Sequence, residues 1–138
     1  MSLTNASLRN LPVCYASVSI GCREEHTLPK KLEAISQAGF TAIELGFPDL
    51  LAFASTYLKK EVGAYDYDDL VISAKVVKAM CEAKKLKVLI LQPFANFEGW
   101  EEGSEERKDA FTRAEGWIRI MEAVGTDMLQ VRRLQIGI

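Results

Sequence analysis

A single histidine and three cysteines are all the imidazole and thiol groups that this 138-residue sequence contains. Cys14, Cys22 and Cys81 form no C-x-x-C pair, and His26 does not lie at zinc-finger spacing from any of them. Neither a disulfide framework nor a structural zinc site is therefore predicted. Reduced thiols and a cytoplasmic location are the simplest interpretation of this cysteine usage.

The sequence also lacks an excess of positive charge and a long apolar run. Lys and Arg number 17 against 19 Asp and Glu, a formal net charge of −2, so no overall attraction to nucleic acid or to an anionic membrane is expected. No stretch approaches the roughly 18 apolar residues of a membrane span. We therefore expect no nucleic-acid partner and no membrane partner.

What is present fits an ordinary globular domain. Hydrophobic residues make up 49% of the sequence and charged residues 26%. A chain of this length fits one domain, and no linker, repeat or low-complexity segment divides it. We expect a single domain over residues 1–138.

The most informative stretch runs from Lys87 to Trp100. Its first part, Val88 to Leu91, is a near-continuous aliphatic run of the kind found in strands that are buried on both faces. We expect the strand to break at Gln92-Pro93 and to lead into a loop of aromatic and polar side chains. Because ligands of α/β proteins bind outside the carboxyl ends of parallel strands, this loop is predicted to face a binding site.

Hydrophobic periodicity predicts four short strands that alternate with helices. Thr27, Asp66 and Ser104 are the expected helix caps, and Gly39 and Gly125 are expected just beyond two helix ends. Strand, helix and strand within about thirty residues form a βαβ unit with parallel strands. The predicted fold class is α/β with a parallel sheet. The expected elements are strand 14–19, helix 27–39, strand 40–46, helix 48–60, helix 66–85, strand 87–92, helix 104–125 and strand 127–131.

The last long helix has apolar residues at helical spacing. Phe111, Ala114, Ile118 and Met121 recur every three or four positions, so they predict its buried face. We interpret the group Phe111, Trp117 and Met121 as core and not as a cofactor site. No dinucleotide-binding glycine motif, phosphate-binding loop, nucleophile elbow or H-E-x-x-H motif occurs.

Five residues are candidates for a binding site at the carboxyl ends of the strands. Glu44 and Gln92 end the second and third predicted strands, where they could hydrogen-bond a substrate hydroxyl. His26 lies in the loop after the first strand, and Asn96 and Trp100 lie in the loop after the third. Three of them have a structural alternative: Glu44 could be satisfied by a backbone N–H or a lysine, His26 could be an exposed loop residue, and Trp100, as a loop aromatic, could simply bury area.

Three segments resemble a known family. Residues 39–45 (Gly-Phe-Thr-Ala-Ile-Glu-Leu) resemble the second strand of the xylose-isomerase-like TIM barrels, which include sugar-phosphate isomerases and epimerases and abasic-site endonucleases. Residues 91–94 with 96–100, followed by 121–131, are similar to the fungal branch that includes the 3-dehydroshikimate dehydratases. The resemblance covers about residues 13–131.

This resemblance implies parallel (β/α) units that form about the first half of a TIM barrel, with four strands and outer helices. A complete (β/α)₈ barrel has around 250 residues. We therefore expect a truncated family member, a single partial TIM-barrel domain in which residues 132–138 are a non-family tail.

The resemblance also implies a chemistry. The full-length relatives are expected to dehydrate 3-dehydroshikimate, a hydroxy-carbonyl compound, to protocatechuate with a divalent metal of the Mg, Mn or Co type. Their metal ligands are implied to lie on later strands. With one histidine and no sets of carboxylates and imidazoles at successive strand ends, this chain is expected to hold no metal and to be inactive alone.

Three other interpretations stay open. A sugar phosphate isomerase or epimerase would share the proton abstraction next to a carbonyl. A non-catalytic half barrel would self-associate through its exposed sheet edges. An open flavodoxin-like sheet would fold alone, with helices on both faces. An abasic-site endonuclease is disfavoured because the loops lack basic and histidine-rich character.

Overall fold

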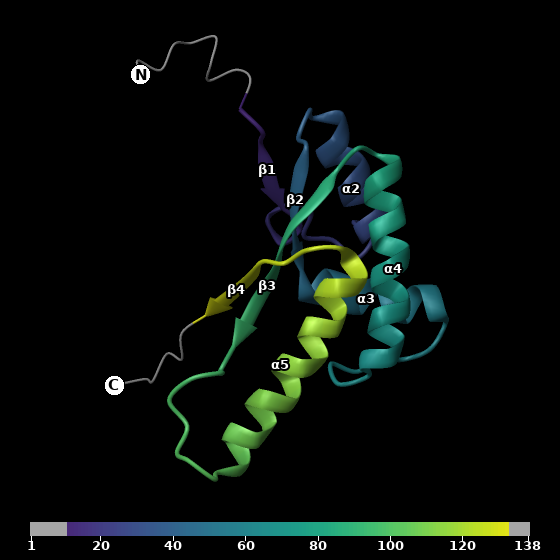
Figure 1. Cartoon of the computed structure of the whole chain (residues 1–138). Coiled ribbons are helices and arrows are strands. Elements are labelled where there is room, and N and C mark those ends of the chain that lie inside the picture. Colours follow the sequence, from purple (N-terminus) through teal and green to yellow (C-terminus); the bar gives the residue numbers. More distant parts are fainter. Residues whose placement is uncertain (1–10, 133–138) are drawn as a thin grey trace, which may run out of the picture.

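The computed structural model of the chain describes residues 11–132 (Figure 1). Strands and helices alternate along the chain in the predicted order. The elements are β1 (Cys14–Ala16), the short 3₁₀ helix η1 (Ser17–Ser19), α2 (Leu28–Gln37), β2 (Ala42–Gly46), α3 (Phe47–Leu58), α4 (Tyr67–Ala83), β3 (Lys87–Ala95), α5 (Glu105–Val124) and β4 (Leu129–Arg132).

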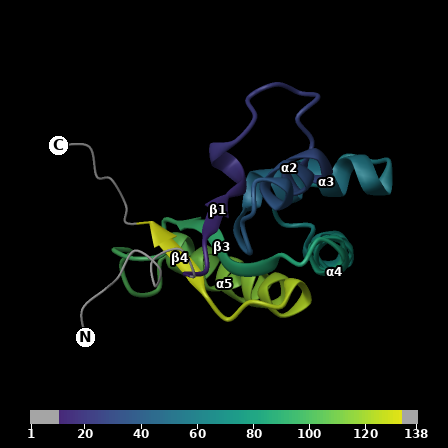
Figure 2. The same cartoon turned by 90° about the horizontal axis from the view of Figure 1, so that it is seen from above.

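The four strands form one parallel sheet in the order β1-β2-β3-β4. The α-helices gather on one side of this sheet, as Figures 1 and 2 show from two directions. An open flavodoxin-like sheet would have the strand order 2-1-3 and helices on both faces. That alternative is wrong, and the predicted parallel (β/α) units with outer helices are confirmed.

Helix boundaries lie near the predicted residues, but of the three expected caps only Ser104 caps its helix with a side-chain hydrogen bond. Thr27 precedes α2 without such a bond. The Ser104 side chain accepts a hydrogen bond from the Arg107 N–H at 3.2 Å, which caps α5. Gly125 has a φ of 83° directly after α5, a left-handed conformation that favours glycine. Asp66 precedes α4 as expected but does not cap it, because its carboxylate accepts the Gly63 N–H at 2.6 Å instead.

The hydrophobic core lies between the sheet and the helices. Ile43 and Leu45 of β2 are fully buried on the helix side and are paired with Val88 and Leu91 of β3. Alternate residues of a strand point to opposite faces, so Glu44 points to the face without helices. The predicted buried residues of α4 are confirmed: Leu70, Ala74, Val77 and Cys81.

Two strand boundaries differ from the predictions. β1 ends at Ala16 because the chain turns into η1, where the Ser17 hydroxyl accepts the Gly46 N–H at 2.9 Å and donates to Asp49 at 2.6 Å. β3 does not break at Pro93 but continues to Ala95. The pairing of β3 with β4 shifts register between Leu91 and Phe94. Pro93, which has no N–H to donate, therefore lies where the hydrogen bonding between these strands is already irregular.

The predicted inner face of α5 is wrong for two of its residues. Phe111 and Ile118 are about half exposed. The predicted core position of Trp117 is confirmed, because the side chain is buried and stacks on Phe47 with ring centroids 4.5 Å apart. Burying this large ring decides the helix orientation. The buried residues of α5 are Ala110, Gly116, Trp117, Ile120 and Val124.

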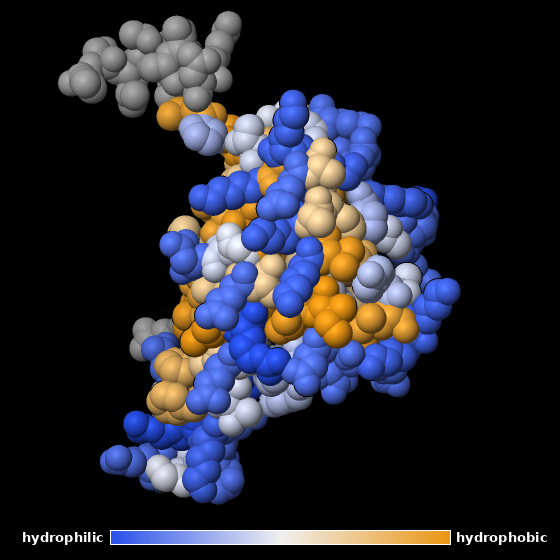
Figure 3. Space-filling model, turned by 45° about the vertical axis from the view of Figure 1, so that its right-hand side comes forward, coloured by the Kyte–Doolittle hydropathy of each residue, from blue (hydrophilic) through white to orange (hydrophobic). Residues whose placement is uncertain are grey.

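The helix side of the molecule is largely hydrophilic around a central apolar area (Figure 3). Ion pairs between α-helices cross this side, including Lys84 with Glu33 and Arg119 with Asp68. Within residues 11–132, no helix has both the length and the apolar character that a membrane crossing needs.

Candidate functional site

Glu44 and Gln92 lie side by side on the face of the sheet without helices. Gln92 is paired with Gly46 at the end of β2, and its Nε2 donates a hydrogen bond to Glu44 Oε2 at 3.0 Å. Gln92 is 9% exposed, so this amide needs a partner within the protein. A carboxylate accepts several hydrogen bonds and an amide both donates and accepts, so the pair can also bind hydroxyl groups.

Cys14 lies on the same face, one strand away. Ala16 of β1 is paired with Glu44, and Cys14 is two residues earlier. Burial raises the pKa of the Cys14 thiol, and the charge of Glu44 raises it further. The thiol is therefore protonated at neutral pH and is neither a nucleophile nor a metal ligand in this state.

The residues present do not fit a complete divalent metal site. Within the part of the chain that the structure describes, no group of three or more His, Cys, Asp and Glu side chains lies close enough to hold a metal. Divalent cations such as Mg²⁺ take about six oxygen ligands, several of them from water or substrate. The Glu44–Gln92 pair offers one carboxylate and one amide.

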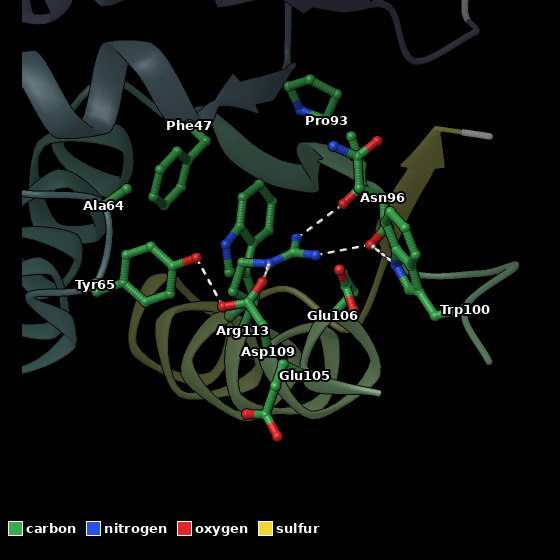
Figure 4. A pocket seen from close by; sticks show the side chains of 12 residues that line it. Phe47, Ala64, Tyr65, Pro93, Asn96, Trp100, Glu105, Glu106, Asp109 and Arg113 are labelled. Atoms are coloured by element: carbon green, nitrogen blue, oxygen red, sulfur yellow. Dashed lines mark hydrogen bonds and ion pairs between the residues drawn. The ribbon is translucent and has the colours of Figure 1, made fainter. Parts of the chain in front are cut away.

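Asn96 and Trp100 lie elsewhere, at a cavity of about 660 Å³ beyond the end of β3 (Figure 4). The Trp100 ring N–H donates to the Asn96 backbone carbonyl at 2.9 Å. Arg113 of α5 donates to the same carbonyl at 2.7 Å and to that of Ala95 at 2.8 Å. These bonds fix the loop after β3 to α5.

A second set of contacts holds the other wall of this cavity. Asp109 accepts hydrogen bonds from Arg113 Nε and from the Tyr65 hydroxyl, both at 2.8 Å. The bond from Arg113, and then that from Tyr65, lowers the pKa of the Asp109 carboxyl. The bond to Asp109 raises the pKa of the Tyr65 hydroxyl.

Sequence reasoning missed Arg113 and Asp109 as residues that organise this cavity. Their i,i+4 spacing does predict an ion pair on one helix. Only the tertiary structure shows that the guanidinium reaches across to the carbonyl groups of Ala95 and Asn96.

His26 lies in a third place. It lines a cavity of about 600 Å³ between the loop after η1 and helices α2 and α3. Its Nδ1 accepts the Arg23 N–H at 3.4 Å. The most buried ion pair of the described residues lines this cavity too, with Lys31 Nζ 2.7 Å from Asp49 Oδ1. The structure thus brings together Glu44 with Gln92, and Asn96 with Trp100, but does not bring all five candidates into one site.

Strand order, helix placement and the polar pair together define a class of protein. Sequential parallel strands with all helices on one side are part of a (β/α) barrel. In such barrels the functional face lies at the carboxyl ends of the strands. Gln92 is level with Gly46, the last residue of β2, and Glu44 lies two residues before Gly46, while β3 continues past Gln92 to Ala95.

The chain belongs to the xylose isomerase-like TIM barrel family, whose model matches residues 32–135. The match extends into the predicted tail of residues 132–138, of which the structure describes only Arg132. The chain is similar to the 3-dehydroshikimate dehydratase of Neurospora crassa, with 29% identity over 120 residues. It is also similar to the enzymes of that name from Pseudomonas putida, with 32% identity, and Pseudomonas aeruginosa, with 35% identity, each over 105 residues.

The chain spans only part of these relatives. The match covers 84% of this chain but 33% of the Neurospora protein, and 76% of this chain but 14% of each Pseudomonas protein. A solved structure of a xylose isomerase-like TIM barrel/4-hydroxyphenylpyruvate dioxygenase fusion protein matches with a TM-score of 0.65 and 29% identity. That match covers 90% of this chain and 16% of the fusion protein, in agreement with a partial TIM barrel.

Proposed function

We propose that the chain supplies one wall of the active site of a lyase related to the 3-dehydroshikimate dehydratases. The observation that carries this proposal is the Glu44–Gln92 pair, held at 3.0 Å on the face without helices. In the proposed role the pair accepts and donates hydrogen bonds to the hydroxyl groups of a small cyclic hydroxy-carbonyl compound. The similarity to three dehydratases supports the substrate class.

In this proposal Glu44 and Gln92 bind and orient the substrate. The hydrogen bond from Gln92 fixes the Glu44 carboxylate, so that its rotamer is set before the substrate arrives. The chain itself is expected to be inactive, because the described residues do not offer the ligands of a complete metal site. The divalent metal that the family resemblance implies would be held by residues of a further part of the barrel.

A chimera tests the proposal. The chain replaces the matching segment of the Neurospora dehydratase, and the conversion of 3-dehydroshikimate to protocatechuate is followed by the absorbance of the aromatic product. We expect activity from the chimera and none from the 138-residue chain alone. If the chimera does not fold, the chain and the remaining segment are co-expressed as separate polypeptides and assayed in the same way.

Two variants of the active chimera then test the pair. Gln92→Leu and Glu44→Gln are each expected to lower kcat/KM by roughly tenfold to a hundredfold, the effect of losing a hydrogen bond to a charged group. Gln37→Leu is the matched control, because Gln37 is exposed on α2 and bonds only Glu33 among the described residues. Unchanged activity in both variants would contradict the proposal. Activity on a ketose phosphate in place of 3-dehydroshikimate would favour the isomerase alternative.

A further inference from the structure

The cavity of about 600 Å³ between the loop after η1 and helices α2 and α3 has no part in the proposed function. We call it the α2–α3 cavity. Two of its walls are helices, whereas Glu44 and Gln92 lie on the face of the sheet without helices. Its volume is within the range of roughly 300–1,000 Å³ that small-molecule sites have. A smaller cavity of about 230 Å³ adjoins it, since His26 and Lys31 line both.

Lys31 brings a buried ammonium group with spare hydrogen-bond donors to this cavity. The residue is 8% exposed, and within residues 11–132 its Nζ donates to one acceptor, Asp49 Oδ1, at 2.7 Å. The other oxygen of Asp49 accepts the Ser17 hydroxyl at 2.6 Å. An ammonium group has three N–H donors, and buried donors need acceptors. The cavity has the room for those acceptors, which are the oxygen atoms of water or of a ligand.

The first turn of α2 also opens on the cavity, because Thr27, Leu28 and Pro29 line it. Thr27 precedes the helix without a side-chain cap, and the first turn holds no acidic residue. The first N–H groups of a helix have no acceptor within it, and together with the helix dipole they stabilise a nearby anion. The helix therefore adds to the preference that Lys31 gives for an anionic ligand.

The other charged groups around the cavity do not reverse this preference. Glu24 is exposed, and Arg23 lies 3.7 Å from Glu25 with both side chains mostly exposed. Exposed charges interact weakly across water. Lys30 lines the smaller cavity and adds a further positive charge.

Much of the remaining wall is apolar. Leu28, Ala52 and Phe53 contribute to it, and the Phe53 ring is stacked on Tyr57 with centroids 5.6 Å apart and planes 12° apart. A flat ring can pack against such a pair. The cavity thus combines an apolar wall with donors for a negatively charged group.

We propose that the α2–α3 cavity binds a small aromatic carboxylate. The carboxylate accepts hydrogen bonds from the Lys31 ammonium near the first turn of α2, and the ring packs against Phe53 and Tyr57. Hydrogen bonds between charged groups are about twice as strong as those between neutral groups, so the charge of the ligand decides its affinity.

Isothermal titration calorimetry of the 138-residue chain with benzoate tests the proposal. We expect saturable binding at one site per chain. Benzoate should bind roughly tenfold more tightly than benzamide, which keeps the ring but lacks the charge. Acetate, which lacks the ring, and benzylamine, which has the opposite charge, should bind no more tightly than benzamide. No saturable binding of benzoate, or equal binding of benzamide or benzylamine, would overturn the inference.

Two variants test whether benzoate binds in this cavity. Lys31→Met should weaken benzoate binding roughly tenfold, and Lys75→Met, at an exposed position of α4, is the control with the same change of charge. Ala52→Phe tests the cavity even if Lys31→Met does not fold, because it fills the space from an exposed position and should abolish binding. Ala79→Phe, exposed on α4, is its control. Undiminished binding in Ala52→Phe would contradict the proposal.

Alkylation of Cys22 locates the ligand without any substitution. Cys22 is exposed and lines the cavity, whereas Cys14 lies on the helix-free face of the sheet. Saturating benzoate should slow the reaction of Cys22 with iodoacetamide and leave that of Cys14 unchanged, as followed by mass spectrometry. An unchanged rate at Cys22, or equal slowing at both thiols, would count against binding in this cavity.

Discussion

Side-chain hydrogen bonds between neighbouring strands set the chemistry of the helix-free face. Gln92 and Glu44 are 48 positions apart in the sequence, yet the parallel pairing of β2 with β3 places their side chains 3.0 Å apart. The same face holds Cys14, whose thiol responds to the Glu44 charge. The reactivity of the Cys14 thiol therefore reports the charge of Glu44.

Glu44→Gln should make Cys14 more reactive. Burial is the larger cause of its raised pKa and remains, but removing the neighbouring negative charge lowers the pKa and raises the thiolate fraction. We expect faster alkylation of Cys14 at mildly alkaline pH, by less than about tenfold, as followed by mass spectrometry. Exposed Cys22 serves as the internal control, and Cys81, whose pKa is raised to about 12, should remain unmodified. An unchanged or slower rate at Cys14 would refute this coupling.

Asp109 should make stability depend on acid pH. Its folded pKa is lowered by the bonds from Arg113 and Tyr65, so its contribution to stability is complete above the unfolded pKa of about 3.9 and is lost as pH falls through the folded pKa. We expect Asp109→Asn to be less stable than wild type at neutral pH and to lose less stability on acidification below about pH 4.

Urea unfolding at several pH values measures this effect. Asp127→Asn, which removes an exposed carboxylate distant in sequence from Asp109, controls for the change in net charge. The hypothesis fails if Asp109→Asn and wild type show parallel loss of stability with falling pH.

At the scale of elements, the packing of α4 on α5 depends on a glycine. Gly116 lies in the middle of α5, where glycine lowers helix stability by about 1 kcal/mol relative to alanine. An added Cβ would lie only 2.3 Å from ring atoms of Tyr67 at the start of α4. Helix propensity disfavours a glycine at this position. Its presence is therefore explained by the close contact between α4 and α5.

Gly116→Ala is expected to destabilise the protein by about 1–3 kcal/mol, because overpacking outweighs the gain in helix propensity. The free energy of unfolding in urea measures it. In a Tyr67→Ala background the same change should instead stabilise by about 1 kcal/mol, since the clash is gone. Glu115→Ala, on the exposed face of α5, controls for a change in helix propensity that leaves the contact with Tyr67 intact. Stabilisation by Gly116→Ala in the wild-type background would show that Tyr67 moves aside without cost.

At the scale of the whole molecule, self-association through the sheet edges is predicted to link stability to concentration, because among the described strands β1 pairs only with β2 and β4 only with β3. If copies of the chain pair through these edges, the folded state is linked to association, and Tm rises with protein concentration. We expect this rise for wild type, measured by thermal unfolding at widely spaced concentrations. We expect it to disappear in Val131→Lys, because Val131 is an exposed apolar residue of β4. A Tm that is independent of concentration in wild type would contradict the link between folding and association.

The sequence predicted much of this fold because its signals are local. The cap at Ser104, the left-handed Gly125 and the apolar face of α4 each depend on residues within a few positions. The order of strands and helices follows from those signals, and the family resemblance supplied the barrel topology. Of the candidate site, sequence reasoning found Glu44 and Gln92 because both end predicted strands.

Contacts between distant segments decided the rest. The bonds of Ser17 to Gly46 and Asp49 end β1 early, and the stacking of Trp117 on Phe47 sets the rotation of α5. Neither effect is encoded in local periodicity, because each depends on which side chains tertiary packing brings together. The sequence by itself thus determined the elements and their order. Only the tertiary structure decided that Glu44 and Gln92 share one face while His26, Asn96 and Trp100 do not join them, since strand register and loop packing are set by the whole fold.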